Sequence, residues 1–184
     1  MVMAQTTAVW TLADLERLPD DGNTYEVVDG ELFVTPAPSL AHESLAYELR
    51  VILEPYVLAQ RIGRVYTPRA VVRVSGSEVE PDLMVRPLTL PRPDTWEDVP
   101  TPLLVVEIVS RTTKRRDHEQ KRAFYLRNGV AQYWLVDGTL RAIRVVRPDA
   151  EDVLVEQELV WHPVGASEAL VVDIPAYFRA ALGA

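Results

Sequence analysis

The stretch that decides the fold is Leu103-Leu-Val-Val-Glu-Ile-Val109, an almost wholly apolar run that one carboxylate, Glu107, interrupts. A strand that is apolar on both faces is normally central in a sheet, because both of its faces are covered. A similar run, Pro81-Asp-Leu-Met-Val85, precedes it and carries Asp82. We therefore expect a buried sheet in which two adjacent strands each carry an acidic residue.

Turn and capping residues predict the elements that precede these strands. Thr11-Leu-Ala-Asp14 has the spacing of a capping box, so we expect a short helix over residues 11–18. Asp29-Gly30 separates two runs of strand formers, and this dipeptide tolerates the positive φ angles of a tight hairpin turn. Leucines at helical spacing predict a long helix over about residues 39–60, which Pro55 can bend.

Strand and helix signals continue to alternate toward the C-terminus. The remaining expected elements are strands within 64–74 and 81–86, the central strand at 103–109, a helix at 114–128, a hairpin at 132–146, a strand near 152–160 and a helix from about 175. This order favours an α/β layered domain. Since the chain has 184 residues, we expect a single domain over residues 1–184.

The composition excludes several classes of protein. A hydrophobic share of 48% and a charged share of 25% argue against wholesale disorder, collagen-like repetition and a coiled-coil rod. The chain has no cysteine, which excludes disulfides, thiolate zinc ligands and a cysteine nucleophile. Neither a secretory signal nor an apolar run long enough to cross a bilayer is visible. We expect a soluble, cytoplasmic protein without membrane contact.

The charge is unevenly distributed along the chain. A formal net charge of -8 argues against a general polyanion binder. Residues 111–147 nevertheless carry an excess of Lys and Arg, of the kind that neutralises nucleic-acid phosphates. The alternative is a solvated helix and an edge strand kept soluble by charge.

The carboxylates of Asp82 and Glu107 are the first indication of chemistry. Strand interiors disfavour both residue types, and a buried ionised carboxylate costs several kcal/mol unless it is paired or binds a metal. Acids at the ends of two adjacent strands thus indicate a divalent cation site, for which oxygen ligands favour Mg²⁺ or Mn²⁺. Alternatively, either acid caps a strand end or pairs with an arginine.

The helix that follows the central strand is the second indication. Asp117, Lys121 and Tyr125 are spaced four residues apart and so share one helix face. From that face a lysine could point back over the carboxylates. The alternative is an exposed Asp117–Lys121 ion pair and a tyrosine that only packs.

Together these residues resemble the PD-(D/E)XK nuclease superfamily, whose signature is an acid on one strand, an acid on the next and a lysine two positions later. The closer resemblance, over nearly the whole chain, is to a group of bacterial restriction-endonuclease-like proteins. The matching segments are Tyr25-Glu-Val-Val-Asp-Gly-Glu31, His42, Pro81-Asp-Leu83, Val106-Glu-Ile-Val-Ser110, the series Asp117, Lys121, Tyr125, and Gly129-Val-Ala-Gln-Tyr-Trp-Leu-Val-Asp137.

One position departs from the superfamily signature. Two residues beyond Glu107 stands Val109, which cannot stabilise a developing anion. In the resembling group the lysine comes from the following helix, which implies Lys121, with Lys114 as the substitute. The resemblance implies a restriction endonuclease-like fold, with a central mixed sheet flanked by helices and an N-terminal β-hairpin extension.

The resemblance also implies a Mg²⁺-dependent (or Mn²⁺-dependent) hydrolysis of DNA phosphodiester bonds. Asp82, Glu107 and the carbonyl of Ile108 would hold the metal, and Lys121 would orient the attacking water or stabilise the phosphate. The further catalytic candidates are Glu26, His42 and Tyr125, with Glu31 as a weaker one. The cations that would grip the DNA backbone are Arg111, Lys114, Arg115 and Arg116.

The rival hypothesis is a non-catalytic module that keeps this fold to bind nucleic acid or a protein, and Val109 and the negative net charge favour it. A Lys121 ammonium near the Asp82 and Glu107 carboxylates favours the nuclease, whereas one in solvent favours the module. A sugar- or nucleotide-processing enzyme has less support, because no glycine-rich phosphate loop is present. By resemblance we also expect a homodimer.

Overall fold

The computed structural model describes residues 9–109 and 117–183. Its main sheet has six strands in the order β10-β9-β8-β7-β6-β3. Strands β7 and β8 run parallel and the other neighbours are antiparallel, so the sheet is mixed. The bounds of these strands are β3 Gly63–Tyr66, β6 Leu83–Pro87, β7 Leu104–Ile108, β8 Tyr133–Asp137, β9 Ala142–Val146 and β10 Val153–Val155.

Two smaller sheets accompany the main one. The four-stranded sheet has the order β2-β1-β5-β4, and the third sheet pairs β11 with β12. The N-terminal hairpin is therefore continued by β5 and β4 rather than standing alone. The bounds are β1 Thr24–Val28, β2 Glu31–Thr35, β4 Val72–Val74, β5 Ser77–Val79, β11 Glu158–Trp161 and β12 Leu170–Asp173.

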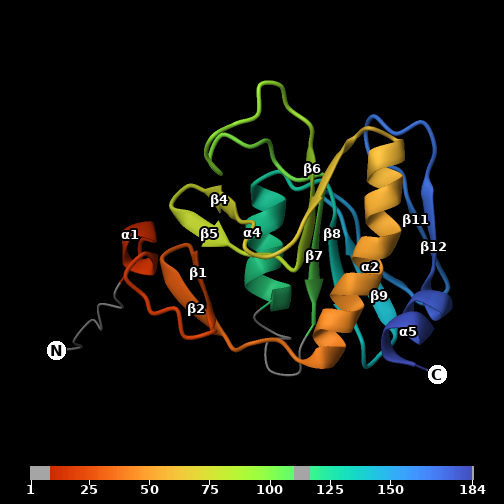
Figure 1. The fold of residues 1–184 in the computed structure, drawn as a ribbon, viewed down its shortest axis with the longest axis horizontal. Helices are drawn as coiled ribbons and strands as arrows, with labels where there is room; N and C mark the ends of the chain where they lie inside the picture. The colour runs from red at the N-terminus through yellow and green to blue at the C-terminus, as the bar shows by residue number, and fades with distance from the viewer. Residues whose placement is uncertain (1–8, 110–116, 184) are drawn as a thin grey trace.

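Helices cover both faces of the main sheet (Figure 1). The long helix α2 and the C-terminal helix α5 pack together over one face, and α4 lies on the other. A π-helical segment runs directly into α4, and such segments often occur at functional sites. The bounds are α1 Leu12–Leu15, α2 Leu40–Ala59, the π-helical segment Asp117–Lys121, α4 Arg122–Arg127 and α5 Ile174–Leu182.

The alternation of side chains along β6 and β7 divides the core in two. Leu83 and Val106, which are register partners, join the cluster under α2. Met84 and Val105, the next pair, join the cluster under α4. Because side chains alternate along a strand, Glu107 points to the same face as Val105, toward α4. The candidate site thus lies on the α4 face of the sheet.

Most of the expected elements are present. Strand β7 is buried throughout, as a central strand requires. The long helix begins after Ser39, whose hydroxyl accepts a hydrogen bond from the backbone N–H of His42, and it contains Pro55. Asp29 and Gly30 have the positive φ angles, 52° and 80°, that the tight hairpin turn requires.

Three elements differ from the expectation. The first helix ends at Leu15 rather than at residue 18. The expected strands at 64–74 and 152–160 are each divided between two sheets. The hairpin expected at 132–146 is present, with a four-residue loop over residues 138–141 in which the Asp137 carboxylate accepts the N–H groups of Thr139 and Leu140. The left-handed residue of that loop is Arg141, with φ 51°.

Within the described ranges, no helix is both long and apolar enough to span a bilayer. The aromatic segment Tyr133-Trp134-Leu135 is buried in the core and is not a surface available for dimer contacts. The homodimer and the single-domain boundary both stay predictions.

Candidate active site

Glu107 is the centre of a buried hydrogen-bond network on the α4 face. The Tyr125 hydroxyl donates to Glu107 Oε1 at 2.7 Å, and the Lys121 ammonium donates to the same oxygen at 3.0 Å. Only 6% of Glu107 and 5% of Lys121 are exposed, so water screens this ion pair little. Lys121 and Tyr125 lie four residues apart, and both reach the carboxylate, as the shared helix face predicts.

Tyr125 acts as a fixed donor to this carboxylate. It is completely buried. Burial, together with the charges of Glu107 and Glu26, raises the pKa of the Tyr125 hydroxyl well above its ordinary value. The hydroxyl therefore keeps its proton at neutral pH and holds one oxygen of Glu107 in place.

Lys121 joins two sheets through its ammonium. Besides Glu107, its Nζ lies 3.0 Å from Oε1 of Glu26, which is on β1 and is 2% exposed. The same Glu26 oxygen accepts the backbone N–H of Glu80 at 2.9 Å. The Lys121 ammonium thus lies between two buried carboxylates, whose charges it compensates.

Asp82 is held beside Glu107 by the main chain. Its Oδ2 accepts the backbone N–H of Ile108 at 2.6 Å, and that N–H belongs to the peptide that follows Glu107. The register partners Leu83 and Val106 also bring Asp82 level with Glu107. The two acids therefore stand at adjacent strand ends, as the sequence predicts.

His42 approaches Asp82 from the first turn of α2. Its Nε2 lies 3.2 Å from Asp82 Oδ2. Burial alone would lower the pKa of His42, but the hydrogen bond and charge of Asp82, with the charge of Glu43, raise it above its ordinary value. Its Nδ1 is buried and makes no hydrogen bond with any described residue.

Glu80 is a member of this region that the sequence analysis missed. Its carboxyl is half-buried, and burial raises its pKa; the charges of Glu26, Glu78 and Asp82 add to the shift, while Arg69 opposes it. The signal that could have identified Glu80 is its position in Glu80-Pro81-Asp82, two acids separated by a proline.

Several expectations fall elsewhere. Glu31 is exposed and accepts a hydrogen bond from Gln120 Nε2 at 2.9 Å. Other expectations concern positions that the structure does not describe. These positions are Arg111, Lys114, Arg115, Arg116 and the side chain of Asp117.

The donor chemistry of the site fits a hard divalent cation. Glu26, Asp82 and Glu107 supply three carboxylates, and Lys121 supplies one permanent cation, so these four side chains together are negative. In the part of the chain that the structure describes, no three His, Asp or Glu side chains are grouped closely enough to form a metal site by themselves. Mg²⁺ does not require such a cage, because it is commonly bound by one or two carboxylates and keeps several waters.

Comparison with solved structures identifies the fold. A protein from Anabaena variabilis, described as a putative nuclease belonging to DUF820, matches with a TM-score of 0.80 and 24% sequence identity. The match covers 94% of this chain and 99% of that one. The fold is thus restriction endonuclease-like, with a central mixed sheet flanked by helices, as the sequence resemblance implies.

The chain belongs to the Uma2 family, which is described as "Putative restriction endonuclease" and whose model matches residues 12–174. No curated protein matches the chain. The family membership confirms the resemblance inferred from the motifs and supports a nuclease function in general terms.

Proposed function

We propose that this protein is a metal-dependent endodeoxyribonuclease that hydrolyses DNA phosphodiester bonds at the Asp82–Glu107 site. The observation that carries the proposal is the position of Lys121. Its ammonium lies 3.0 Å from Glu107, although the signature position two residues beyond Glu107 is a valine. The buried Lys121, which comes from the neighbouring helix, supplies at Glu107 the positive charge that Val109 cannot supply.

The residues that would hold a Mg²⁺ or Mn²⁺ ion are Asp82, Glu107 and the backbone carbonyl of Ile108. When bound, the ion polarises a phosphoryl oxygen and lowers the pKa of a coordinated water. Asp82 is fixed by the Ile108 N–H and faces His42, so its carboxylate is oriented before any ligand arrives. Such outer hydrogen bonds orient metal ligands and commonly change metal affinity by 10–100-fold.

Lys121 is the proposed catalytic cation. Its two carboxylate contacts fix the ammonium at the edge of the acidic site. From there it would orient the attacking water or stabilise the charge that develops on the phosphate. Glu26 is a positioning residue in this scheme, because it acts on the reaction through Lys121. Tyr125 likewise acts through Glu107, whose carboxylate it orients.

The test combines calorimetry with plasmid cleavage. Mg²⁺ and Mn²⁺ are titrated into the wild type, into an Asp82→Asn, Glu107→Gln double variant, and into Glu158→Gln, an exposed acid on β11 that serves as the control. We expect the wild type and the control to bind metal and cut DNA, and the double variant to do neither. A folded wild type that neither binds metal nor cuts any form of DNA would favour the non-catalytic module.

A further inference from the structure

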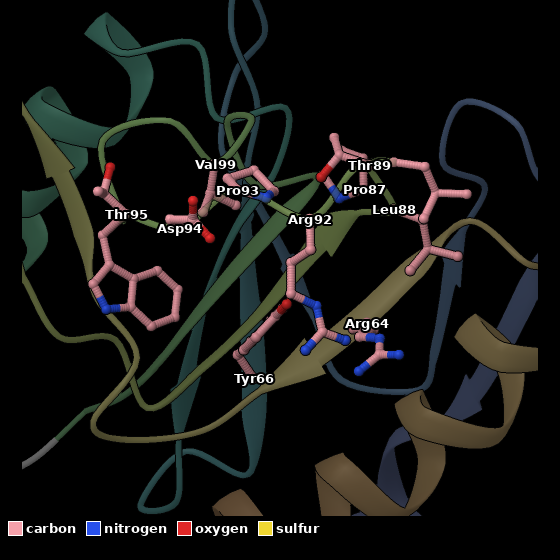
Figure 2. A pocket seen from close by; sticks show the side chains of 12 residues that line it. Arg64, Tyr66, Pro87, Leu88, Thr89, Arg92, Pro93, Asp94, Thr95 and Val99 are labelled. Carbon is pink, nitrogen blue, oxygen red and sulfur yellow. The ribbon is translucent and has the colours of Figure 1, made fainter.

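A second cavity opens at the edge of the main sheet. It has a volume of about 510 Å³ and lies between the edge strand β3 and the loop that follows β6 (Figure 2). Its chemically distinctive lining residues are Arg64, Tyr66, Arg92, Asp94 and Trp96. We name it the Arg64–Trp96 pocket. None of these residues takes part in the Asp82–Glu107 site.

The strand register places this pocket on the same face of the sheet as that site. Tyr66 on β3 pairs with Met84 on β6, which pairs with Val105 on β7. Paired residues on neighbouring strands point to the same face, and Glu107 follows Val105 by two residues. Met84 and Val105 are themselves buried, so packed core separates the pocket from the acidic site on this face.

Two exposed arginines give the pocket a cationic wall. Arg64 is on β3 and Arg92 is on the loop, and Figure 2 shows both guanidinium groups extending to the same side of the pocket, beside Tyr66. Asp94 is the acid that lines the pocket with them. The lining therefore has a positive balance, although the whole chain carries a net charge of -8.

A third arginine is buried behind this wall. Arg86 is 2% exposed, and its guanidinium donates to the carbonyls of Val71, Val99 and Pro100. These partners are neutral, so its charge is not cancelled by a carboxylate contact. Burial lowers the pKa of Arg86 to about 10, which still leaves it charged at neutral pH. Its bonds to Val99 and Pro100 also fix the loop and so preform the pocket.

The adjoining wall is aromatic. The rings of Tyr66 and Trp96 meet edge to face with centroids 5.9 Å apart, and the Arg86 guanidinium lies 5.8 Å from the Trp96 ring centre. Flat aromatic surfaces stack with nucleobases, and arginine pairs bind phosphate oxygens through several hydrogen bonds. A ligand with a planar ring at one end and a phosphate at the other matches both walls.

We propose that the Arg64–Trp96 pocket binds one unstacked nucleotide of a single-stranded segment of DNA, with its base on the aromatic wall and its phosphate on the two arginines. The role of this contact in cleavage, which would be to anchor the strand at the end of β6 opposite Asp82, rests on the proposed nuclease function. The binding itself does not. A free nucleotide offers the same chemistry, and the experiment separates the two sources.

Binding is measured in EDTA, so that cleavage plays no part. A short, fluorescently labelled oligothymidylate is titrated with the wild type, with an Arg64→Ala, Arg92→Ala double variant, and with Trp96→Leu. The control is Arg50→Ala, Arg179→Ala, which removes two exposed arginines from α2 and α5 on the other face. We expect affinity to fall on the order of tenfold in each pocket variant, and less than about twofold in the control.

A spectroscopic readout reports on the pocket directly. Of the other three tryptophans, Trp134 and Trp161 are fully buried, and the partly exposed Trp10 lies against the Asp29-Gly30 turn and does not line the pocket. We therefore expect oligothymidylate to quench the intrinsic fluorescence of the wild type and much less that of Trp96→Leu. Equal affinity of the wild type and the arginine double variant, with equal quenching in Trp96→Leu, would overturn the proposal.

Competition identifies the source of the nucleotide. Thymidine monophosphate is expected to compete weakly; if it competes as well as the strand, the single strand is the wrong ligand. Inorganic phosphate that competes as well as thymidine monophosphate would overturn the stacking role of the aromatic wall. The Asp82→Asn, Glu107→Gln variant should bind the strand like the wild type. A wild type that binds the strand in the pocket but does not cleave DNA would contradict the nuclease alone. A wild type that cleaves DNA but does not bind the strand in the pocket would contradict the pocket alone.

Discussion

At the scale of single residues, the site depends on a lysine whose charge is enclosed by protein. Lys121 has carboxylate oxygens from β1 and β7 at the same distance, 3.0 Å. Replacing a buried ion pair by apolar groups can be neutral, but removing one partner alone leaves an uncompensated buried charge. The stability of the protein and the chemistry of the site are therefore coupled through this residue.

The first prediction concerns Lys121→Met. We expect it to lower the free energy of unfolding by about 3 kcal/mol, because Glu26 and Glu107 are left facing each other without a cation. Urea denaturation in the absence of metal measures the loss. The matched control is Arg122→Met. It removes an ion pair between Arg122 and Asp152 that is more exposed, so it should lower the free energy of unfolding by less than about 1 kcal/mol.

Adding Glu26→Gln to Lys121→Met should recover part of this stability, since it removes one of the two opposed charges. It should not recover DNA cleavage, because the catalytic cation is still absent. A Lys121→Met variant as stable as the wild type would contradict the buried ion pair.

The second prediction concerns Tyr125→Phe. Glu107 loses a hydrogen bond from a neutral donor to a buried charge, so we expect about 2 kcal/mol of destabilisation. If Glu107 binds the metal, Mg²⁺ affinity should also fall about tenfold, because the carboxylate is no longer held in one orientation. Calorimetry measures the affinity, with the exposed Tyr47→Phe as the control. Unchanged stability would argue against the Tyr125–Glu107 contact.

At the scale of elements, the two helices on the α2 face are joined by one buried polar contact. The Tyr177 hydroxyl of α5 donates to the Leu45 carbonyl of α2 at 2.9 Å. Burial, with a smaller effect from Glu48, raises the pKa of Tyr177 above its ordinary value of 10.0. The folded protein therefore keeps this proton at a pH where the unfolded chain has lost it.

The third prediction follows from that shift. At pH 7, Tyr177→Phe should cost about 1 kcal/mol, the value of one hydrogen bond. Above the ordinary pKa of tyrosine, the unfolded chain loses the phenol proton while the folded protein still holds it. The free energy of unfolding therefore falls as pH rises above that pKa. Tyr177→Phe lacks this pH-dependent loss of stability. The difference in melting temperature between the wild type and Tyr177→Phe should therefore narrow between pH 8 and pH 11. A constant gap would contradict the shift.

The sequence predicted the helices, strands and turns more completely than the contacts between them. Period and turn chemistry act within a few residues, which is why α2, β7 and the Asp29-Gly30 turn are where they were expected. The hairpin at 132–146 was also predicted, but the dipeptide does not reveal that the Asp137 side chain accepts backbone N–H groups of the loop.

At the scale of the whole molecule, the proposed nuclease would have to bind DNA against a net charge of -8. Contacts with phosphate release counterions, so binding weakens as salt rises. The cations of the Arg64–Trp96 pocket would then matter more than their number implies, since the net charge of the chain opposes binding of the strand.

The fourth prediction is a salt dependence. For single strands the slope of log K against log salt is about 0.7 per phosphate contact. Because both arginines contact one phosphate in the proposal, we expect the Arg64→Ala, Arg92→Ala variant to have a slope smaller by about 0.7 than the wild type, measured with oligothymidylate in EDTA. The Arg50→Ala, Arg179→Ala control changes the net charge equally and should keep the wild-type slope. Equal slopes in all three proteins would contradict local phosphate contacts.

The sequence by itself determined the elements of the main sheet, the pairing of two strand-end acids and the helix face that carries Lys121 and Tyr125. These depend on periodicity and on the cost of a carboxylate in an apolar strand, which are both local properties. Only the tertiary structure decided that Glu26 reaches Lys121, that His42 faces Asp82, and that Arg86 builds a pocket from the loop after β6. These contacts join residues far apart in the chain, and they exist only because the two sheets and α2 pack around one another.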